Sequence, residues 1–599
     1  MVKLETIRTI FYAEGLGGIG RRVKDRLLSP SYSNWIKQTE RACAASDLQR
    51  PLTGTPLISL LVPVYNVEEQ WLTLAVDSVL KQSYPHWQLC LADDASTAHH
   101  VRPLLEAYAQ RDERIHVVFC NANGGISAAT NQALAIAQGE FIALLDNDDE
   151  LAPNALYEVA SHIQAHPEAD FIYTDEDHIT PKGKRKNPFF KPDWSPEYLH
   201  ACMYTLHLSV YRTSLVRKIG GFRSAYDGAQ DWDLALRISE HTSQIHHIPK
   251  VLYHWRVLPS SMSSGVDAKP WAYQSAQKAL QDMVDRSPYP GWVEEGVKPG
   301  LFRVRRHIEE KPLVSILIPS AGTHLTINGK QVCLVEQCLY SIRTLSTYSN
   351  IEIVLVDGND ISEKTLSAVI SALKGLDLKL LHCDRPFNFS ERMNLAARAA
   401  KGDILLILND DTKVITPDWI EAMLELAQQK EIGAVGAKLF YPNGRLQHAG
   451  ILMLAGIPGH AFHRSAGDYD GYYCSSLVTR NYLGITGACL MMRRVLFEEL
   501  GGFDENFDLN YNDVDLCLRA HAAGYRNVFT PYAKLIHYES ISRVTGLNEG
   551  EIERLQNKFE CTGYMDNDPY YNPNLSTRGP FFQLEWPNRK QTKHRTQGK

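Results

Sequence analysis

The stretch LLDNDDEL, residues 144–151, places four acidic residues directly after an apolar run that begins at Phe141. A second apolar run, ILLIL at residues 404–408, is followed in nearly the same way by NDD at residues 409–411. Short continuous apolar runs are typical of strands buried in a parallel sheet, and such strands usually end in turn residues. Because clustered carboxylates repel one another, an acidic strand end that occurs twice needs a chemical explanation.

Five segments of the first half of the chain recur in the same order in the second half, which indicates a tandem duplication of a domain of about 250 residues. We therefore expect an N-terminal extension over residues 1–50, a first domain over residues 51–300, and a second domain with a C-terminal tail over residues 301–599. SPYPGWVEEGVKPG, residues 287–300, is rich in Pro and Gly and predicts the linker. The matched segments are LISLLVPVYN from Leu57 with LVSILIPSAG from Leu313, WQLCLADDAS from Trp87 with IEIVLVDGND from Ile351, GISAATNQALAIAQGEFIALLDNDD from Gly125 with FNFSERMNLAARAAKGDILLILNDD from Phe387, GGFRSAYDGAQDWDLALR from Gly220 with GGFDENFDLNYNDVDLCLR from Gly501, and VLYHWR from Val251 with LIHYES from Leu535.

Strand-like and helix-like segments alternate within each copy. In the first copy, apolar strands are expected at residues 58–64 and 88–94, an amphipathic helix at residues 71–83, and a second helix that ends at Gly139. This alternation predicts right-handed βαβ units and an open α/β sheet in each copy. Ligands bind beyond the carboxyl ends of such strands, so the polar strand ends should line one crevice. In the first copy these ends are Pro63–Asn66, Asp93–Asp94 and Asp146–Asp149.

Asp146 and Asp148 are separated by one residue at a strand end, a spacing that can direct two carboxylates to one point. A hard divalent cation would remove their repulsion, and Mg²⁺ is usually held by one or two carboxylates together with substrate phosphates. A single pair of this kind is more often a turn or a helix cap. Its recurrence as Asn409 and Asp411 favours a metal site in both copies, with less negative charge in the second.

Asp231 in AQDWDLALR and Asp513 in YNDVDLCLR stand at expected helix starts, after Gly-rich GGF segments and aromatic residues. Caps and surface pairs are the plain interpretation of such acids, but for these two we favour a general base. The acids two residues later are suited to holding the helix through i,i+4 ion pairs. Those pairs are Asp233 with Arg237 and Asp515 with Arg519.

His254 and His537 follow those aspartates at nearly the same distance along the chain. A buried core histidine and a contact to a metal or phosphate explain them equally well. The second copy also has His448, His460 and His463 in a stretch rich in Gly, His and Tyr that suits an acceptor sugar. A metal site there is the less favoured interpretation, because no carboxylates are in register with these histidines.

The composition excludes several classes of protein. A net charge of −7 argues against a general nucleic-acid binder, and no apolar run approaches the length of a membrane span. The first fifteen residues lack the features of a signal peptide. The eleven cysteines contain no CxxC pair, which favours reduced thiols in the cytosol. Two basic segments, residues 17–28 and 589–599, are suited to an anionic membrane surface, and a solvated helix and a frayed tail fit them equally well.

Taken as a set, these motifs resemble family 2 glycosyltransferases with the GT-A fold, over about residues 55–260 and 312–548. The set comprises the VPVYN strand, the DD-x-S turn, the G-x-S-x-x-x-N helix, the DxD strand end and the acid-Asp helix start. Four strings of the first copy are similar to segments of bacterial cell-surface polysaccharide transferases: YTDEDHI, FKPDWSPEYL, GAQDWDLALR and LYHWR. Five strings of the second copy are similar to the rhamnosyltransferase-type members of that group: FNFS, LNDDT, GRLQHAG, GITGACLMMRR and NDVDLCLR.

The resemblance implies a role for each matching residue. Pro63, Tyr65 and Asp94 or Asp93 would contact the nucleotide base and ribose. Asp146 and Asp148 would hold Mg²⁺ or Mn²⁺ on the donor diphosphate with His254 nearby, and Asp231 would deprotonate the acceptor hydroxyl. The corresponding residues of the second copy are Pro319, Asp357, Asn409, Asp411, Asp513 and His537.

The resemblance therefore predicts two tandem nucleotide-diphospho-sugar transferase domains. The expected enzyme is bifunctional and inverting, and it moves sugars from nucleotide-diphosphate donors to a growing cell-surface polysaccharide on a lipid-linked acceptor. It would be cytoplasmic, with peripheral contact at the inner face of the plasma membrane, and would bind no nucleic acid. One alternative is a single active domain beside a degenerate carbohydrate-binding domain. A nucleotidyltransferase is disfavoured because VPVYNVEEQ is neither Gly-rich nor basic.

Overall fold

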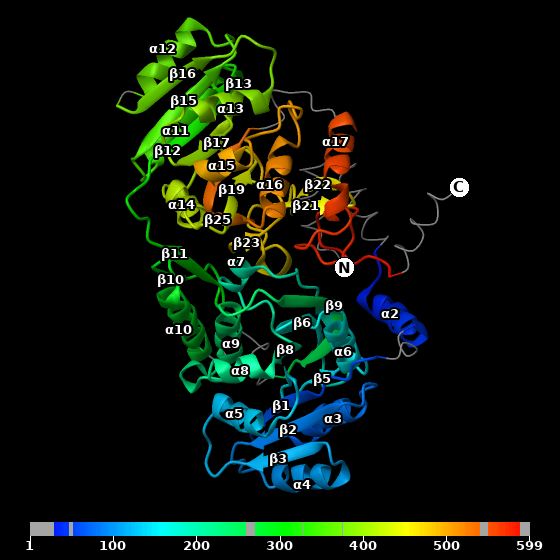
Figure 1. Cartoon of the computed structure of the whole chain (residues 1–599). Coiled ribbons are helices and arrows are strands. Elements are labelled where there is room, and N and C mark those ends of the chain that lie inside the picture. The colour runs from blue at the N-terminus through cyan, green and yellow to red at the C-terminus, as the bar shows by residue number, and fades with distance from the viewer. Residues whose placement is uncertain are drawn as a thin grey trace, which may run out of the picture.

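The computed structural model describes residues 29–46, 52–258, 270–327, 329–373, 375–538 and 549–587. Within these ranges the chain forms two α/β units, the first below and the second above in Figure 1. Each unit is built around one large sheet, which confirms the α/β class and the tandem arrangement predicted from the sequence. The basic segments at residues 17–28 and 589–599 fall outside the described residues.

The first unit has a nine-stranded sheet in the order β3-β2-β1-β4-β8-β6-β9-β5, with β7 paired to β6. Strands β3, β2, β1 and β4 are mutually parallel, and β8 is antiparallel to β4. Its strands are β1 Ile58–Val64, β2 Trp87–Asp93, β3 Ile115–Phe119, β4 Phe141–Leu144, β5 Glu150–Leu151, β6 Phe171–Ile179, β7 Arg185–Phe189, β8 Ser209–Arg212 and β9 Ile245–Arg256. Its helices are α3 Glu69–Leu80, α4 Val101–Arg111, α5 Ile126–Ile136, α6 Ala155–Ala165, α7 Pro196–Leu199, α8 Thr213–Lys218, α9 Gln230–Ser239 and α10 Pro270–Arg286, with α2 Tyr32–Ser46 before the sheet.

The second unit repeats this order as β16-β15-β12-β17-β24-β19-β25-β18, with β20 paired to β19 and β23 paired to β25. Its strands are β12 Val314–Ser320, β13 His324–Ile327, β14 Lys330–Cys333, β15 Ile351–Asp357, β16 Asp377–His382, β17 Ile404–Leu408, β18 Thr412–Val414, β19 Ile432–Phe440, β20 Leu446–His448, β21 Ile451–Leu454, β22 Ile457–His460, β23 Arg480–Asn481, β24 Cys489–Arg493 and β25 Arg526–His537. Its helices are α11 Leu334–Leu345, α12 Glu363–Ala372, α13 Phe389–Ala399, α14 Trp419–Ala427, α15 Arg494–Glu499, α16 Asn512–Ala522 and α17 Glu549–Phe559.

The polar strand ends meet at one edge of each sheet. In the first unit the end of β1 pairs with the end of β2, and β4 runs parallel to β1 on its other side. Strand β4 starts opposite β1 at Phe141, as β17 starts opposite β12 at Ile404. Asp146 and Asn409 therefore occupy equivalent positions beyond these strands, and this confirms their assignment as counterparts.

The segment predicted to be the linker, residues 287–300, contains the first strand of a β-hairpin. Strands β10 Gly291–Glu295 and β11 Phe302–Arg306 pair antiparallel, with Val293 and Phe302 buried. Arg305 binds Glu425 of α14, with 2.6 Å between nitrogen and oxygen, which joins the hairpin to the second unit. The prolines lie outside the two strands and Gly291 is the first residue of β10, so the backbone is able to pair.

The two units form a polar, buried junction. Glu197 of α7 binds Arg526 at the start of β25, with 2.9 Å between the charged atoms. Ser195 donates a 2.7 Å hydrogen bond to Asn481 of β23. Asn572, in the C-terminal segment drawn in red beside the junction in Figure 1, donates to the buried carboxylate of Asp175 in β6. Buried polar groups need such partners, so these bonds fix how the units pack together.

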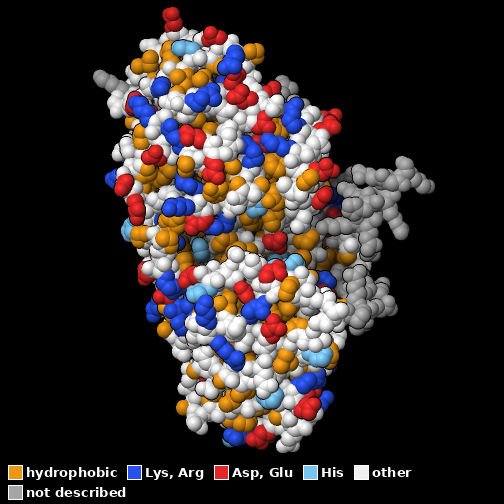
Figure 2. All heavy atoms as spheres, in the orientation of Figure 1, with side chains coloured by type: hydrophobic (Ala, Val, Ile, Leu, Met, Phe, Trp, Pro, Cys, Tyr) orange, Lys and Arg blue, Asp and Glu red, His pale blue; other side chains and the backbone are white. Residues whose placement is uncertain are grey.

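The surface carries both signs of charge. Lys, Arg, Asp and Glu side chains are interspersed over the face shown in Figure 2. The cysteines with described side chains are all free thiols, as the sequence predicts. None of the described helices has the length and apolar character needed to cross a bilayer.

Candidate active sites

The first candidate site begins where β4 ends. Asn147 donates a 2.8 Å hydrogen bond from its side chain to the carbonyl oxygen of Pro63, which fastens the turn to the end of β1. The backbone N–H of Asp146 donates to the hydroxyl of Tyr253 on β9 at 3.2 Å. Strands β1 and β9 thus position the acidic turn at the carboxyl edge of the sheet.

This turn concentrates negative charge. Burial and the neighbouring charge of Asp146 raise the pKa of Asp148 to about 6. Asp149 is fully buried, and burial raises the pKa of its carboxyl well above the ordinary value. One ligand atom each from Asp146, Asp149 and His207 lies within 4.8 Å of the other two. A divalent cation near Asp146 would offset the repulsion between these carboxylates, but Asp148, the other ligand predicted from the sequence, does not belong to this group.

Asp149 does more than form a turn, the role that its sequence suggests. Its carboxylate accepts a 2.6 Å hydrogen bond from the Tyr253 hydroxyl and another of 2.6 Å from the backbone N–H of Arg256. Both donors belong to β9. Asp149 therefore fixes β9 against the acidic turn.

His207, which sequence reasoning missed, approaches the first site from the residues just before β8. Its ring lies 3.8 Å from a carboxylate oxygen of Asp146 and 3.4 Å from Glu176, and it stacks on Tyr253. Burial favours the neutral ring, but Glu176 and the acidic turn outweigh burial and raise the pKa of His207 to about 9. Nothing in the repeats points to this residue, because the strand register places Ala488 at the equivalent position of the second unit.

The structure does not bring His254 to the carboxylates, which corrects the expectation from the sequence. His254 Nδ1 lies 2.7 Å from Asp177, whereas Tyr253 and Trp255 both contact the ring of His207. Successive side chains of a strand point to opposite faces, so His254 points away from the site.

The error lies in the alignment of the two copies. Leu151 pairs with Tyr253 in the first unit as Val414 pairs with Leu535 in the second, so Trp255 is the counterpart of His537. The pairing of His254 with His537 is therefore off by one residue, and a shift of one residue exchanges the two faces of a strand.

In the second unit His537 does reach the strand-end residues. Its Nε2 atom lies 3.0 Å from Asp411 Oδ1 and 3.3 Å from Asn409 Nδ2. Its Nδ1 atom lies 2.8 Å from the side-chain oxygen of Gln447, a contact that favours a proton on Nδ1. Nε2 then faces Asp411 with its lone pair, the arrangement that metal-binding histidines usually have.

A cavity of about 550 Å³ opens at this site. Most site residues predicted for the second copy line this cavity. They are Pro319, Asn409, Asp411, Asp513 and His537.

The aspartates predicted as bases lie at helix starts, as expected. Burial raises the pKa of Asp231, at the start of α9, and the charges of His207 and Asp146 act on it. Asp513, at the start of α16, accepts hydrogen bonds from the backbone N–H groups of Gly487 at 2.7 Å and of Val514 at 2.8 Å. Burial also raises the pKa of Asp513. Both carboxyls are thus better proton acceptors than an ordinary aspartate.

The acids two residues further on form the ion pairs predicted from the sequence. Asp233 binds Arg237 at 2.8 Å and Asp515 binds Arg519 at 2.7 Å. Each arginine also donates to backbone carbonyl oxygens of the preceding GG segment, such as that of Gly221. These pairs hold the helices that carry Asp231 and Asp513.

The residues predicted to contact the nucleotide lie at the same sheet edges. Tyr65 is 49% exposed beyond β1 and offers a ring face to a ligand. Asp94 accepts backbone hydrogen bonds from Gly124 and Gly125. The equivalent turns of the two units are held by Asp93, which binds the N–H of Ser96, and by Asp357, which binds the N–H groups of residues 360 and 361.

The three histidines considered as an alternative metal site do not converge. His448 and His460 are joined through their Nδ1 atoms at 2.8 Å, whereas His463 binds the Tyr441 hydroxyl. Burial lowers the pKa of His460 to about 3 and holds the pKa of His448 well below its ordinary value. Both line the cavity as neutral rings that can donate and accept hydrogen bonds.

Comparison with known proteins gives the family. The model of glycosyl transferase family 2 matches residues 59–220 and 328–501, one span in each unit and together more than half of the chain. "Uncharacterized protein y4gI" of Sinorhizobium fredii (strain NBRC 101917 / NGR234) is 41% identical over 568 residues, which are 92% of this chain and 61% of that protein. "O-antigen biosynthesis protein RfbC" of Myxococcus xanthus is 37% identical over 553 residues, 91% of this chain and 42% of that protein.

A third relative aligns with about one domain. "Hyaluronan synthase" of Pasteurella multocida is 29% identical over 214 residues, 36% of this chain and 22% of that protein. The chain spans less than two thirds of the length of each of these three relatives. The family match covers both units, and each unit has the sheet and the acidic strand end described above. The chain is therefore a glycosyltransferase that belongs to glycosyl transferase family 2 and contains two tandem GT-A domains.

Proposed function

We propose that both units transfer sugars, with inversion, from nucleotide-diphosphate donors to a growing cell-surface polysaccharide of the O-antigen or capsule type. The observation that carries this proposal is the same in each unit: a partly exposed aspartate with a raised pKa stands at a helix start, near an acidic strand end. The names of the relatives from Myxococcus xanthus and Pasteurella multocida support a polysaccharide product.

The strand-end residues would hold a divalent cation, Mg²⁺ or Mn²⁺. In the first unit Asp146 and Asp148 are the proposed ligands, and in the second Asn409, Asp411 and His537. When bound, the cation neutralises charge on the donor diphosphate and so makes it a better leaving group. His207 has a pKa of about 9 and adds a positive charge beside Asp146, where the donor phosphates would lie.

Asp231 and Asp513 would each take the proton of an acceptor hydroxyl. Their raised pKa values suit this step, because a base works best when its pKa approaches the working pH. The backbone N–H groups of Gly487 and Val514 hold the Asp513 carboxylate in place. Both donors are neutral, so neither lowers the pKa of Asp513 as a positively charged partner would.

The carboxylates around the second cavity support inversion. Those that line it are Asp410 and Asp411 at the strand end and Asp513 opposite them. Asp410 accepts a 2.6 Å hydrogen bond from Ser320, and Asp411 is a proposed metal ligand. Among the described lining residues, Asp513 is then the carboxylate left for the acceptor, and a single base with direct displacement inverts the anomeric carbon.

The nucleotide would lie over the ends of β1 and β2 in the first unit. We propose that Pro63 and Tyr65 contact the base, and that Asp93 and Asp94 bind the ribose and base edge; Pro319 and Asp357 take these roles in the second unit. A lipid-linked oligosaccharide at the cytoplasmic face of the membrane fits the polysaccharide product. Figure 2 shows mixed charge on the visible face, in keeping with a partner other than nucleic acid.

Single-site variants test the assignment of both units. D231N and D513N, each made separately, should lower transfer by that unit by roughly 10²–10⁴-fold, because asparagine keeps the shape but cannot accept the proton. Transfer is measured with radiolabelled nucleotide sugars, and linkage analysis of the product assigns each activity to a unit. Wild-type transfer rates in both variants would overturn the proposal.

A second candidate, one active unit beside a carbohydrate-binding unit, is favoured by a specific difference. Asn409 replaces the charge that Asp146 supplies in the first unit. If this candidate is right, D231N alone abolishes all sugar incorporation, and D513N changes only acceptor binding. Incorporation of nucleotide instead of sugar would point to a nucleotidyltransferase.

A further inference from the structure

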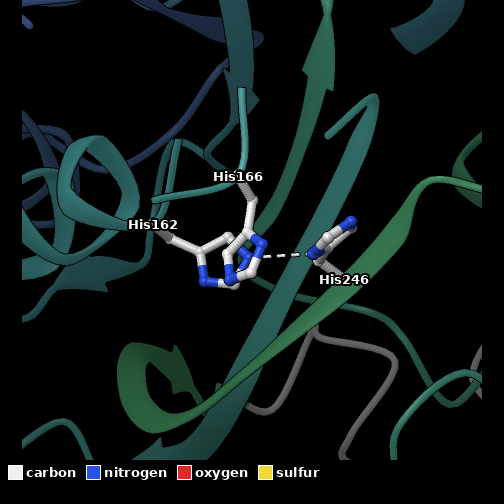
Figure 3. A group of neighbouring side chains, drawn as sticks. All are labelled: His162, His166 and His246. Carbon is white, nitrogen blue, oxygen red and sulfur yellow. Dashed lines mark hydrogen bonds between the residues drawn. The ribbon is translucent and has the colours of Figure 1, made fainter. Parts of the chain in front are cut away.

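Three histidines gather at the opposite end of β9 from the first candidate site. His162 lies in the last turn of α6, His166 caps the C-terminal end of that helix, and His246 lies near the start of β9 (Figure 3). Tyr253, which contacts the acidic turn, lies seven positions after His246 along β9, so the two places are about 20 Å apart. The cluster is therefore distinct from the strand-end site.

The nitrogens of this cluster have the spacing of metal ligands. One ring nitrogen of each histidine lies within 4.8 Å of one from both others. His162 Nε2 and His246 Nδ1 are 3.2 Å apart. Two nitrogens bound to Zn²⁺ at 2.0–2.1 Å with tetrahedral geometry lie about 3.3 Å from each other, so these two need almost no movement to share an ion. All three rings are partly exposed, which gives an ion access.

The surroundings favour a cation. His166 Nδ1 lies 3.4 Å from a carboxylate oxygen of Glu168, the contact through which carboxylates orient metal-binding histidines. The C-terminal end of α6 adds the negative end of a helix dipole.

We propose that His162, His166 and His246 bind a transition-metal ion such as Zn²⁺, which fastens the C-terminal end of α6 to β9. Imidazole ligands select Zn²⁺, Ni²⁺ or Cu²⁺, whereas Mg²⁺ prefers oxygen. The donor set separates this site from the strand-end carboxylates, and the proposal holds whether or not both units transfer sugars. Water or Glu168 completes the coordination.

The test uses the full chain, freed of metal by chelation and then kept in excess Mg²⁺ to occupy oxygen sites. Zn²⁺ binding is measured by calorimetry and elemental analysis, and Co²⁺ is used as a spectroscopic probe of tetrahedral nitrogen coordination. The variants are H166Q and the double variant H162Q/H246Q. H116Q, which changes an exposed histidine of β3 in the same unit, is the matched control.

Wild type and H116Q should bind one more equivalent of Zn²⁺ than H162Q/H246Q, and H166Q should bind roughly tenfold more weakly or worse. Zn²⁺ should also raise the melting temperature of wild type and H116Q but not of the double variant. Equal Zn²⁺ binding by all four proteins would overturn the proposal. The proposal would also fail if wild type did not bind this additional equivalent of Zn²⁺, because the three histidines would then be joined only by hydrogen bonds. Thermal melting in chelator shows that each variant is folded.

Discussion

His537 Nε2 lies 3.0 Å from Asp411 Oδ1, in a position that the first unit gives to Trp255. The first unit brings a histidine to its acidic turn from a different place, because His207 precedes β8. The two sites therefore share a fold and an acidic strand end but differ in how imidazole reaches it. This difference makes the effects of histidine substitutions unequal.

H537Q should lower transfer by the second unit by roughly 10–100-fold, the usual range for loss of a group that supports a metal site. H254Q is its matched partner from the sequence repeat and should leave transfer by the first unit within about twofold, since His254 binds Asp177 on the other face of β9. Rates are measured with each unit's donor at saturating Mn²⁺ and again at limiting Mn²⁺. Equal losses in H254Q and H537Q would contradict the strand register.

Exchange of one residue should shift the metal requirement of the two units in opposite directions. N409D adds a carboxylate to the second site and should lower the Mn²⁺ concentration for half-maximal transfer by roughly tenfold, and D146N should raise it in the first site by a similar factor. The measurement is transfer rate against Mn²⁺ concentration for each single variant. An unchanged curve for N409D would show that Asn409 takes no part in binding the cation.

The repeats predicted the sheet, the acidic strand ends and the two helix-start aspartates, because these depend on local patterns that occur twice. They could not predict His207, which reaches Asp146 only through the tertiary fold. They misplaced His254, because two short apolar-aromatic stretches align equally well in either of two registers. A shift of one residue is invisible to the sequence and decides which face a side chain takes.

Gly139 is required by the fold for a reason that the sequence does not show. The sequence predicts that it ends a helix, but α5 already ends at Ile136. A Cβ atom at Gly139 would lie 2.7 Å from the carbonyl oxygens of Leu57 and Phe141. Glycine is required there because the backbone passes close to β1, a contact that only the folded sheet reveals.

The junction between the units should be sensitive to the loss of one charge. E197Q leaves Arg526 partly buried without its carboxylate, and we expect a loss of roughly 3 kcal/mol in the free energy of unfolding. The measurement is urea unfolding followed by tryptophan fluorescence. E113Q, an exposed acid of the first unit, should change stability by less than about 0.5 kcal/mol. A loss in E197Q no larger than that in E113Q would show that the ion pair contributes little to the junction.

Asp568 should make stability fall as the pH rises through neutrality. Its buried carboxyl accepts hydrogen bonds from the backbone N–H groups of Met453 and Tyr570, both at 2.8 Å. Burial is the main cause that raises its pKa to about 7, although those two bonds and Arg480 oppose the shift. In the unfolded chain the pKa of an aspartate is about 3.9, so between pH 4 and pH 7 the folded state holds the extra proton.

The sign then follows from linkage. Where the folded state binds more protons, the free energy of unfolding decreases as the pH rises, so the contribution of Asp568 is complete near pH 4 and is lost through pH 7. D568N imitates the protonated acid and should remove this dependence. Relative to D568N, wild type should lose roughly 3 kcal/mol of stability between pH 5 and pH 8, most of it below pH 7. The comparison of the two proteins cancels the titration of other groups. Parallel stability curves over this range would show that the Asp568 carboxyl is already ionised in the fold at pH 5.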